Sequence, residues 1–259
     1  MGHFEFDGQK YKIASSHQKE WGARIIAELN LTGAEAILDL GCGDGVLTKV
    51  LSDLVPQGKV LGIDASMGMI ETAKELAGHN LSFACQDIND MAFYNEFDLI
   101  FSNAALHWVK DHKRLLRSCY SALKPGGAVR FNFAGDGNCA NFFEVIRQVM
   151  GSPAYSKYLE SFVWPWYMPK ISEYGELVKQ YKFRESKCWE ENADRYFKSK
   201  EEMINWIDQP SIVPFLQFLP EQIRNGFRNE VVHKMVDKTI QPDGTCFETF
   251  RRINVFARK

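Results

Sequence analysis

Short apolar runs alternate with helical patterns over the first half of the chain. The apolar runs are nearly continuous, which is typical of parallel strands that are buried on both faces. They predict strands at residues 36–40, 59–64, 81–87, 97–103 and 127–135. Between them, apolar residues recur at helical spacing in residues 46–55, 68–77 and 112–124. This alternation predicts an α/β fold with a Rossmann-like, doubly wound and mostly parallel sheet.

The chain follows a different pattern after Gly135. Aromatic residues crowd around prolines within residues 136–172, and a second helical block occupies residues 199–240. Between these blocks the pattern predicts a helix at 171–183 and a strand at 184–191, and the alternating C-terminal segment is predicted as a late edge strand. The predicted sheet then has seven strands, and the two blocks are insertions that we expect to form a helical lid over the strand ends.

Composition and charge exclude several classes of partner. The net charge of −2 provides no basic field for nucleic acid, and no apolar run is long enough to span a bilayer. The N-terminus is too polar for an export signal, and the six cysteines are scattered, with no CxxC pair and no histidines at metal-ligand spacing. We therefore expect a cytoplasmic protein with reduced thiols and no metal, nucleic-acid partner or membrane partner, and the oligomeric state stays open.

Three glycines alternate in the stretch ILDLGCGDGVL of residues 37–47, between the first predicted strand and the first predicted helix. Ligands of open α/β sheets bind beyond the carboxyl ends of the strands, where glycines let a ligand approach the bare backbone. The spacing is GxGxG, whereas a nicotinamide fingerprint is GxGxxG, and here Val46 occupies the place of the third glycine. No P-loop pattern is present, so the glycines indicate another nucleotide-type cofactor unless they only form a tight turn.

Two aspartates end the next predicted strands. Asp64 follows Gly45 by nineteen positions (64 minus 45), where a carboxylate can bind both ribose hydroxyls. Asp87 ends the third strand and is placed to accept a hydrogen bond from an adenine amino group. Asp64 could instead cap the following helix, and Asp87 could instead form an Asx turn.

The motifs LDLGCGDG, GIDAS, CQDI, SNAALHW and LKPGG occur in this order, and the chain resembles the class I S-adenosylmethionine-dependent methyltransferases. The resemblance covers most of residues 11–135. The segments SNAALHW, WYMP, EY and FARK are more narrowly similar to the trans-aconitate methyltransferase group, and LHW is similar to the juvenile-hormone-acid methyltransferases. Both groups esterify carboxylates, so the narrower resemblance implies small-molecule O-methylation of a carboxylate, with S-adenosylmethionine as the cofactor.

The resemblance implies which residues contact the methionine end of this cofactor. Gly41, Cys42 and Gly43 are assigned to the methionine end, and Asp39, which precedes them, is counted with these contacts. Asn103, at the start of the NAALHW turn, is assigned to the methionyl backbone near the sulfonium. Cys42 could instead be only a small residue that the turn tolerates.

The resemblance also implies the contacts of the nucleoside end. Asp64 would bind the ribose, and Ala65 and Met69 would flank the adenine ring. Asp87 and Ile88 would supply the contacts to the polar edge of the adenine.

The N-terminal segment YKIASSHQ resembles a gate, in which Tyr11 and Gln18 close over the cofactor, although an exposed helix explains these two residues nearly as well. The expected layout of the single methyltransferase domain, residues 1–259, is a gate helix at 1–30, a cofactor-binding half at 31–135, lid insertions at 136–172 and 199–240, and the final helix and strands at 173–198 and 241–259.

The need for a general base depends on the methyl acceptor. A carboxylate is already ionised near neutrality, whereas a hydroxyl or an amine needs a base, for which His107 is the candidate by position. A histidine beside a tryptophan is also often only packed and hydrogen-bonded. Trp108, Trp166 and Tyr167 are predicted to form the wall of an apolar substrate pocket, or alternatively a plain lid core.

An anionic substrate favours a guanidinium group, which binds carboxylates in a bidentate fork. Arg195 is the predicted substrate contact, and Arg251 and Arg252 are further candidates in the C-terminal segment. Three functions stay as alternatives: methylation of another small metabolite on oxygen or nitrogen, S-adenosylmethionine binding without turnover, and a nicotinamide-dependent oxidoreductase, against which the glycine spacing argues.

Overall fold

The computed structural model describes residues 16–259, without the side chains of residues 16, 17, 209 and 210. Tyr11 of the predicted gate therefore lies outside the described residues. The chain divides into two compact units. Among the described residues, the first comprises residues 16–136, Trp166–Glu191 and Arg252–Lys259, and the second comprises Gly137–Pro165 and Asn192–Arg251.

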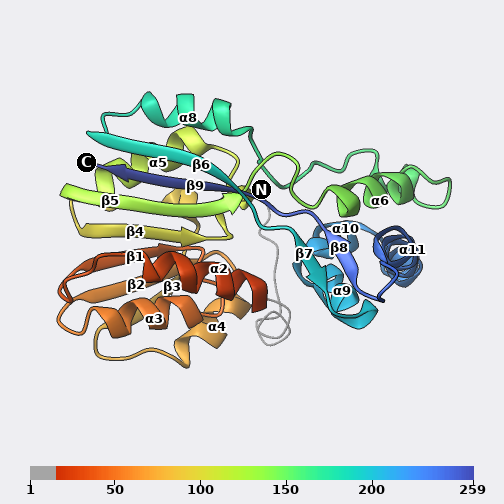
Figure 1. The fold of residues 1–259 in the computed structure, drawn as a ribbon, viewed down its shortest axis with the longest axis horizontal. Coiled ribbons are helices and arrows are strands. Elements are labelled where there is room, and N and C mark those ends of the chain that lie inside the picture. The colour runs from red at the N-terminus through yellow and green to blue at the C-terminus, as the bar shows by residue number, and fades with distance from the viewer. Residues whose placement is uncertain (1–15) are drawn as a thin grey trace. The chain divides into compact units, whose positions relative to one another are not determined.

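The first unit is built on the seven-stranded sheet, in the order β3-β2-β1-β4-β5-β9-β6 (Figure 1). Its strands are β1 (Ala36–Leu40), β2 (Lys59–Asp64), β3 (Leu81–Cys85), β4 (Phe97–Asn103), β5 (Leu123–Ala134), β6 (Glu185–Asn192) and β9 (Arg251–Arg258). Strands β1 to β5 pair in parallel, and β9 pairs antiparallel with β5. The sheet confirms the predicted doubly wound, mostly parallel fold. The strand order reverses at β1, so the ends of β1 and β4 form the switch point at which such sheets bind ligands.

The prediction that the C-terminal segment forms an edge strand is wrong. Strand β9 lies between β5 and β6. Its residues Ile253, Val255 and Ala257 are buried in the core on one face of the sheet, and Arg252 and Asn254 are buried on the other. The alternation of apolar and polar residues therefore reflects a polar contact layer inside the protein rather than a solvent-exposed face.

Helices cover both faces of the sheet (Figure 1). Helices α2 (Ser16–Ala27), α3 (Val46–Leu54) and α4 (Met67–Lys74) pack on one face, and α5 (His112–Ala122) and α8 (Ile171–Lys179) pack on the other. Adjacent strand residues alternate between the two cores, as Ile37 and Leu38 of β1 do. Two short 3₁₀ turns, η1 (Ile88–Asp90) and η2 (Leu106–Trp108), follow the ends of β3 and β4.

The second unit is mostly helical and has a two-stranded sheet of its own. Its elements are α6 (Ala140–Met150), α7 (Ser156–Leu159), β7 (Arg195–Phe197), α9 (Lys200–Trp206), a π-helical turn η3 (Ile207–Ser211), α10 (Val213–Phe218), α11 (Glu221–Thr239) and β8 (Cys246–Glu248). Because β7 pairs with β8, residues 192–198 and 241–251 join this unit, while residues 166–172 belong to the first unit. The insertions therefore have different boundaries from those expected, and their action as a lid stays a prediction.

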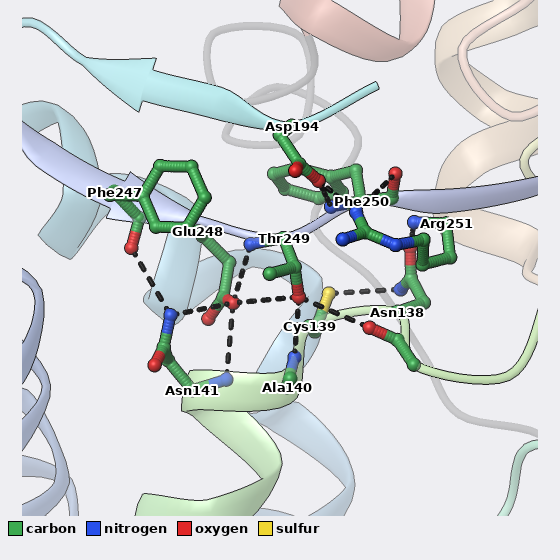
Figure 2. A network of polar contacts seen from close by, with 11 residues as sticks. Asn138, Cys139, Ala140, Asn141, Asp194, Phe247, Glu248, Thr249, Phe250 and Arg251 are labelled. Carbon is green, nitrogen blue, oxygen red and sulfur yellow. Dashed lines mark hydrogen bonds and ion pairs between the residues drawn. The ribbon is translucent and has the colours of Figure 1, made fainter. Parts of the chain in front are cut away.

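Glu248 is fully buried in the second unit. Figure 2 shows the polar contacts that surround its side chain. Its carboxylate accepts hydrogen bonds from the backbone N–H groups of Asn141 (3.1 Å), Phe142 (2.9 Å) and Thr249 (2.7 Å). Two of these donors lie in the first turn of α6, where the helix has no partners of its own for its N–H groups. The carboxylate thereby joins strand β8 to the N-terminus of α6.

Glu248→Gln is expected to lower the free energy of unfolding by about 2 kcal/mol, because the amide NH₂ group replaces an acceptor that faces buried N–H donors. Urea denaturation followed by circular dichroism measures this loss. Glu160 is exposed and provides the matched control, Glu160→Gln, which is expected to change the unfolding free energy by less than about 0.5 kcal/mol. Equal losses in the two variants would contradict the role given to Glu248.

Candidate functional site

The glycine turn follows β1 directly. The N–H groups of Gly41 and Cys42 both donate to the carbonyl of Ile63 in β2, at 2.8 and 3.0 Å. Gly41, Gly43 and Gly45 have φ angles of 69°, 56° and 77°, in the left-handed region that favours glycine. A Cβ atom on Gly41 would lie 2.2 Å from the Cβ atom of Ala105. Both the backbone angle and the close approach of the turn after β4 therefore require glycine at position 41.

Asp64 connects the end of β2 to the glycine turn. Its carboxylate accepts hydrogen bonds from the N–H groups of Gly43 (3.0 Å) and Ser66 (2.9 Å). The N-cap of α4 is Ser66, whose Oγ atom accepts from the N–H of Met69 at 3.4 Å. The alternative interpretation of Asp64 as the helix cap is therefore wrong.

Asp39 lies beneath the glycine turn and is only 2% exposed. The hydroxyl of Thr48 donates to its carboxyl group at 2.7 Å. Burial, together with the nearby charge of Asp64, raises the pKa of Asp39 to about 7, although the hydrogen bond from Thr48 acts in the opposite direction. Asp39 is therefore a buried acid that is partly protonated near neutral pH.

The predicted adenine contacts lie at the ends of β2 and β3. Met69 and Ile88 are buried, and Ala65 is half-buried. The carboxylate of Asp87 accepts from the backbone and side-chain N–H groups of Asn89, at 2.8 and 2.9 Å. The Asx turn that the sequence left as an alternative is therefore present, and the contact of Asp87 with adenine stays a prediction.

A small pocket opens between the glycine turn, the end of β4 and helix α2. Its lining includes six of the predicted cofactor contacts, which are Gln18, Asp39, Gly41, Cys42, Gly43 and Asn103. Four further lining residues were not predicted, and they are Lys19, Asp44, Leu47 and Phe101. The residues predicted to contact the ribose and the adenine do not line this pocket: Asp64, Ala65, Met69, Asp87 and Ile88.

Two buried acceptors in this pocket lack partners. The side-chain amide of Asn103 donates to the backbone carbonyl of Gln18 at 2.8 Å. Within residues 16–259, the Oδ1 atom of Asn103 and the Oε1 atom of Gln18 are buried without a hydrogen-bond partner. Unsatisfied buried acceptors are costly, so their presence in one pocket indicates a ligand that carries donor groups.

The ion pair between Lys19 and Asp44, at 2.7 Å, is also part of the pocket and was missed by the sequence reasoning. Asp44 lies within the glycine motif and so carried a signal. Its partner on α2 follows no pattern that the sequence shows.

The turn after β4 has a strained backbone. Ala104 has a φ angle of 57°, a left-handed conformation that costs a non-glycine residue about 1–2 kcal/mol. Its N–H group donates to the carbonyl of Asn132 in β5 at 2.7 Å. Strain of this kind persists where the surrounding structure enforces it, often at functional sites. Here it directs the chain from Asn103 into the η2 turn that contains His107.

His107 has an unpartnered nitrogen. Its Nδ1 atom is buried without a hydrogen-bond partner in the described part of the chain. Burial and, to a smaller extent, the charges of Arg252 and His112 lower the pKa of His107 to about 3. The ring is therefore neutral near pH 7 and is a weak proton acceptor. The low pKa of His107 argues against the predicted use of this residue as a general base. No contact in the structure tests that role directly.

The predicted substrate aromatics gather around the η2 turn. The ring of Trp108 lies 5.8 Å from that of His107 and 5.2 Å from that of Trp166, between centroids. The N–H of Tyr167 donates to the carbonyl of His107 at 2.8 Å. These residues of the first unit are far apart in the sequence but lie together, although the structure shows no substrate contact of theirs.

His112 is a buried residue of this region that the sequence reasoning missed. Its Nε2 atom donates to the carbonyl of Leu106 at 2.9 Å, so its Nδ1 atom accepts from the hydroxyl of Tyr174, also at 2.9 Å. Its side chain therefore holds the η2 turn against helix α8. Burial lowers the pKa of His112 to about 4, which keeps this ring neutral as well.

The candidate arginines lie in different units. Arg252 in β9 is 4% exposed, donates from Nε to Oδ1 of Asn132 at 2.8 Å, and stacks 4.8 Å above the ring of Trp21. Arg195 lies in β7 of the second unit, opposite Glu248 of β8. Arg251 also belongs to the second unit, where it forms an ion pair with Asp194. The role of Arg195 in substrate binding stays a prediction.

The structure also describes the cysteines, the possible metal ligands and the lengths of the helices. All six cysteines are free. In the described part of the chain, no three histidine, cysteine, aspartate or glutamate side chains are placed to hold a metal ion. None of the helices between residues 16 and 259 combines the length and the apolar character that crossing a membrane requires.

The doubly wound sheet, with a glycine turn and a polar pocket at its switch point, defines a Rossmann-like cofactor-binding protein. Residues 37–127 match a family described as a methyltransferase domain. Trans-aconitate 2-methyltransferase of Mycobacterium tuberculosis is 24% identical, over 97% of this chain and 96% of its own length. Malonyl-[acyl-carrier protein] O-methyltransferase of Priestia megaterium is 33% identical, but the match covers 52% of this chain and only 50% of that relative.

Among solved structures, phosphoethanolamine N-methyltransferase 2 of Haemonchus contortus in complex with S-adenosyl-L-methionine has the same fold. The TM-score is 0.61 at 19% identity, over 97% of this chain and 56% of the matched chain. This likeness shows the shared fold. The family match and the relatives identify the chain as a methyltransferase, in agreement with its resemblance to the class I S-adenosylmethionine-dependent enzymes. The cofactor that this resemblance implies is S-adenosylmethionine.

Proposed function

We propose that the pocket at the ends of β1 and β4 holds the methionine end of S-adenosylmethionine. Its features fit this group: the Oδ1 atom of Asn103 and the Oε1 atom of Gln18 are acceptors for an α-ammonium group. Gly43 lines the pocket, and because it has no side chain it leaves its backbone open to a ligand. When bound, S-adenosylmethionine supplies an electrophilic methyl group on a sulfonium.

The nucleoside end is proposed to lie along the ends of β2 and β3. Asp64 would bind the ribose, and its position beside the glycine turn supports this role. Met69 and Ile88 would supply apolar contacts to the adenine, with Asp87 at its polar edge. Ala65 completes this proposed set.

We propose further that the methyl acceptor is a carboxylate of a small molecule. The observation that carries this proposal is the buried guanidinium of Arg252, whose positive charge acts on the ring of His107. Arg252 binds Asn132, whose carbonyl in turn binds Ala104 at the start of the turn that carries His107. The charge of Arg252 also contributes to the low pKa of His107.

This arrangement suits a carboxylate better than a hydroxyl or an amine. A carboxylate needs no general base, and the neutral His107 with its low pKa would be a poor one. A guanidinium attracts a carboxylate and can orient it in a bidentate fork. Both relatives are named after carboxylic acids, trans-aconitate in one case and a malonyl group in the other. These names support the same acceptor class.

In this proposal the protein contributes mainly by positioning and by excluding water. Arg252 holds the carboxylate, and the unpartnered Nδ1 atom of His107 is available for a hydrogen bond to the substrate. Trp108, Trp166 and Tyr167 keep the acceptor away from bulk water. Holding two reactants in line can lower the barrier by about 7–11 kcal/mol.

The experiment that tests the acceptor class is transfer of a labelled methyl group from S-adenosylmethionine to separate pools of small carboxylates, phenols and amines. Trans-aconitate and a malonyl thioester are assayed individually. We expect label only in the carboxylate pool. Transfer to the phenol or amine pool, with none to carboxylates, would reject the proposal while leaving the enzyme class intact.

Arg252→Gln is expected to lower kcat/KM for the carboxylate substrate about thirtyfold, because a hydrogen bond to a charged group contributes about 2 kcal/mol. Arg252→Lys keeps the charge without the fork and is expected to lose about tenfold. Steady-state kinetics measures both variants, and titration with S-adenosylmethionine verifies that the cofactor still binds.

Arg258→Gln in the same strand is the matched control, because the Arg258 side chain is partly exposed and donates to the carbonyl of Gly126. It is expected to change kcat/KM less than twofold. An Arg252→Gln variant as active as this control would remove the observation on which the carboxylate proposal rests.

A further inference from the structure

Three carboxylates surround the glycine turn, and their partners differ. Asp44 is ion-paired with Lys19 at 2.7 Å. Asp64 accepts hydrogen bonds from two backbone N–H groups. The carboxyl group of Asp39 has the fewest partners of the three. Among the described residues, the Thr48 hydroxyl is the one group that donates a hydrogen bond to it, and no cation pairs with it. Asp39 is thus a buried acid in the pocket wall without a compensating positive charge.

The groups that face Asp39 leave this part of the pocket negative. Asp64 faces it from the end of β2, and Cys42 and Asp44 face it from the glycine turn. The thiol of Cys42 stays neutral, because burial and the charges of Asp64 and Asp39 raise its pKa well above the ordinary value. Lys19 on α2 is the cation of the lining, and it is engaged with Asp44.

A ligand charge in the pocket therefore has a direct effect on Asp39. S-adenosylmethionine and S-adenosylhomocysteine carry the same ammonium and carboxylate groups and differ at the sulfur, which is a cationic sulfonium in the donor and a neutral thioether in the product. A positive charge nearby stabilises the ionised form of a buried carboxyl, whereas a neutral sulfur does not.

We propose that Asp39 discriminates the charged methyl donor from its neutral product by changing its protonation state. With the sulfonium form bound, the carboxyl of Asp39 releases its proton to solvent. After the methyl–sulfur bond has broken and the thioether remains, the carboxylate takes a proton back from solvent. The proposal rests on the proposed placement of the methionine end in this pocket, and it does not depend on the identity of the acceptor.

The protonation equilibrium of the Asp39 carboxyl group supports this role. Its pKa is raised to about 7, so both forms are populated near neutral pH. Binding that favours the ionised form becomes tighter as the pH rises through this value, because less protonated acid has to be converted. The preference for S-adenosylmethionine over S-adenosylhomocysteine is therefore expected to rise by up to about tenfold between pH 6 and pH 8.

Isothermal titration calorimetry tests the proposal directly. Each ligand is titrated into the 259-residue chain at pH 6, 7 and 8, in two buffers of different ionisation enthalpy, so that released protons are counted. At pH 7 we expect S-adenosylmethionine to release about half a proton more than S-adenosylhomocysteine. In Asp39→Asn we expect this difference and its pH trend to vanish, while S-adenosylhomocysteine still binds at one site.

Asp53→Asn is the matched control, because Asp53 is exposed on helix α3, pairs with Lys49 and does not line the pocket. It is expected to keep the difference in proton release between the two ligands. Equal proton release by both ligands in the wild-type protein would overturn the proposal, and so would a difference that persists in Asp39→Asn. If Gly41→Ala leaves both affinities unchanged, the placement of the cofactor fails instead, which separates the two failures.

Discussion

Gly41→Ala is expected to weaken the binding of S-adenosylmethionine at least about 300-fold. The new Cβ atom would lie 2.2 Å from that of Ala105, so the turn after β4 must move, and this turn carries Asn103 and His107. The φ angle of 69° adds a strain of about 1–2 kcal/mol for alanine. Displacement of the Asn103 acceptor from the pocket accounts for the remaining loss. Calorimetric titration with S-adenosylmethionine measures the effect.

Gly78→Ala is the matched control for this variant. Gly78 lies in the loop before β3, and nothing lies within 4 Å of a Cβ atom added there. This variant is expected to bind S-adenosylmethionine within twofold of the wild-type affinity. Wild-type affinity in Gly41→Ala would show that the cofactor does not use the glycine turn.

His112→Leu is expected to lower the free energy of unfolding by about 3 kcal/mol at pH 7. The substitution leaves the carbonyl of Leu106 and the hydroxyl of Tyr174 without their partner in a buried place, and each unsatisfied group costs about 1–3 kcal/mol. Tyr174→Phe removes only one of the two contacts and is expected to cost about 1 kcal/mol. Urea denaturation of the two variants and the wild type measures both values.

The pH dependence of His112→Leu provides a second check. The pKa of His112 is lowered to about 4 in the folded protein, so its ring stays neutral there while it becomes protonated in the unfolded chain. The unfolded state then binds more protons, and the wild type loses stability as the pH falls from about 6.5 towards 4. The stability difference between wild type and His112→Leu is expected to shrink by about 2 kcal/mol between pH 7 and pH 5. A difference that is constant with pH would contradict the buried neutral state of His112.

The central sheet was predictable from the sequence because its strands are continuous apolar runs buried on both faces. The predicted bounds of β1 and β4 are those of the structure. The position of the C-terminal strand was not predictable in the same way. Its polar residues Arg252 and Asn254 suggest an exposed face, but they are buried against Asn132, which lies more than a hundred residues earlier.

The glycine turn was predictable for a related reason, because its residues are contiguous and their spacing is specific. Contacts between distant segments were not. Asn103 meets the backbone of Gln18 across 85 positions, and His112 meets Tyr174 across 62. In the sequence, His112 is only a polar residue at the start of an amphipathic helix. Its function as a buried connector depends on the packing of α8, which no local pattern encodes.

The boundaries predicted for the two insertions differ from those of the second unit for the same reason. Residues 241–251 were expected to belong to the sheet of the first unit, but the pairing of β7 with β8 assigns them to the second. Short strands of three residues carry too little alternation to reveal their partner.

The chemical stability of the transferred methyl group distinguishes a methyl ester from an ether or a methylamine, and it therefore tests the proposed carboxylate acceptor. After reaction with S-adenosylmethionine labelled in its methyl group, the purified product is treated with mild alkali, and volatile methanol is counted. A methyl ester releases its label as methanol, which is the predicted result. An ether or a methylamine would keep its label in the non-volatile product, and this result would reject a carboxylate as the methyl acceptor.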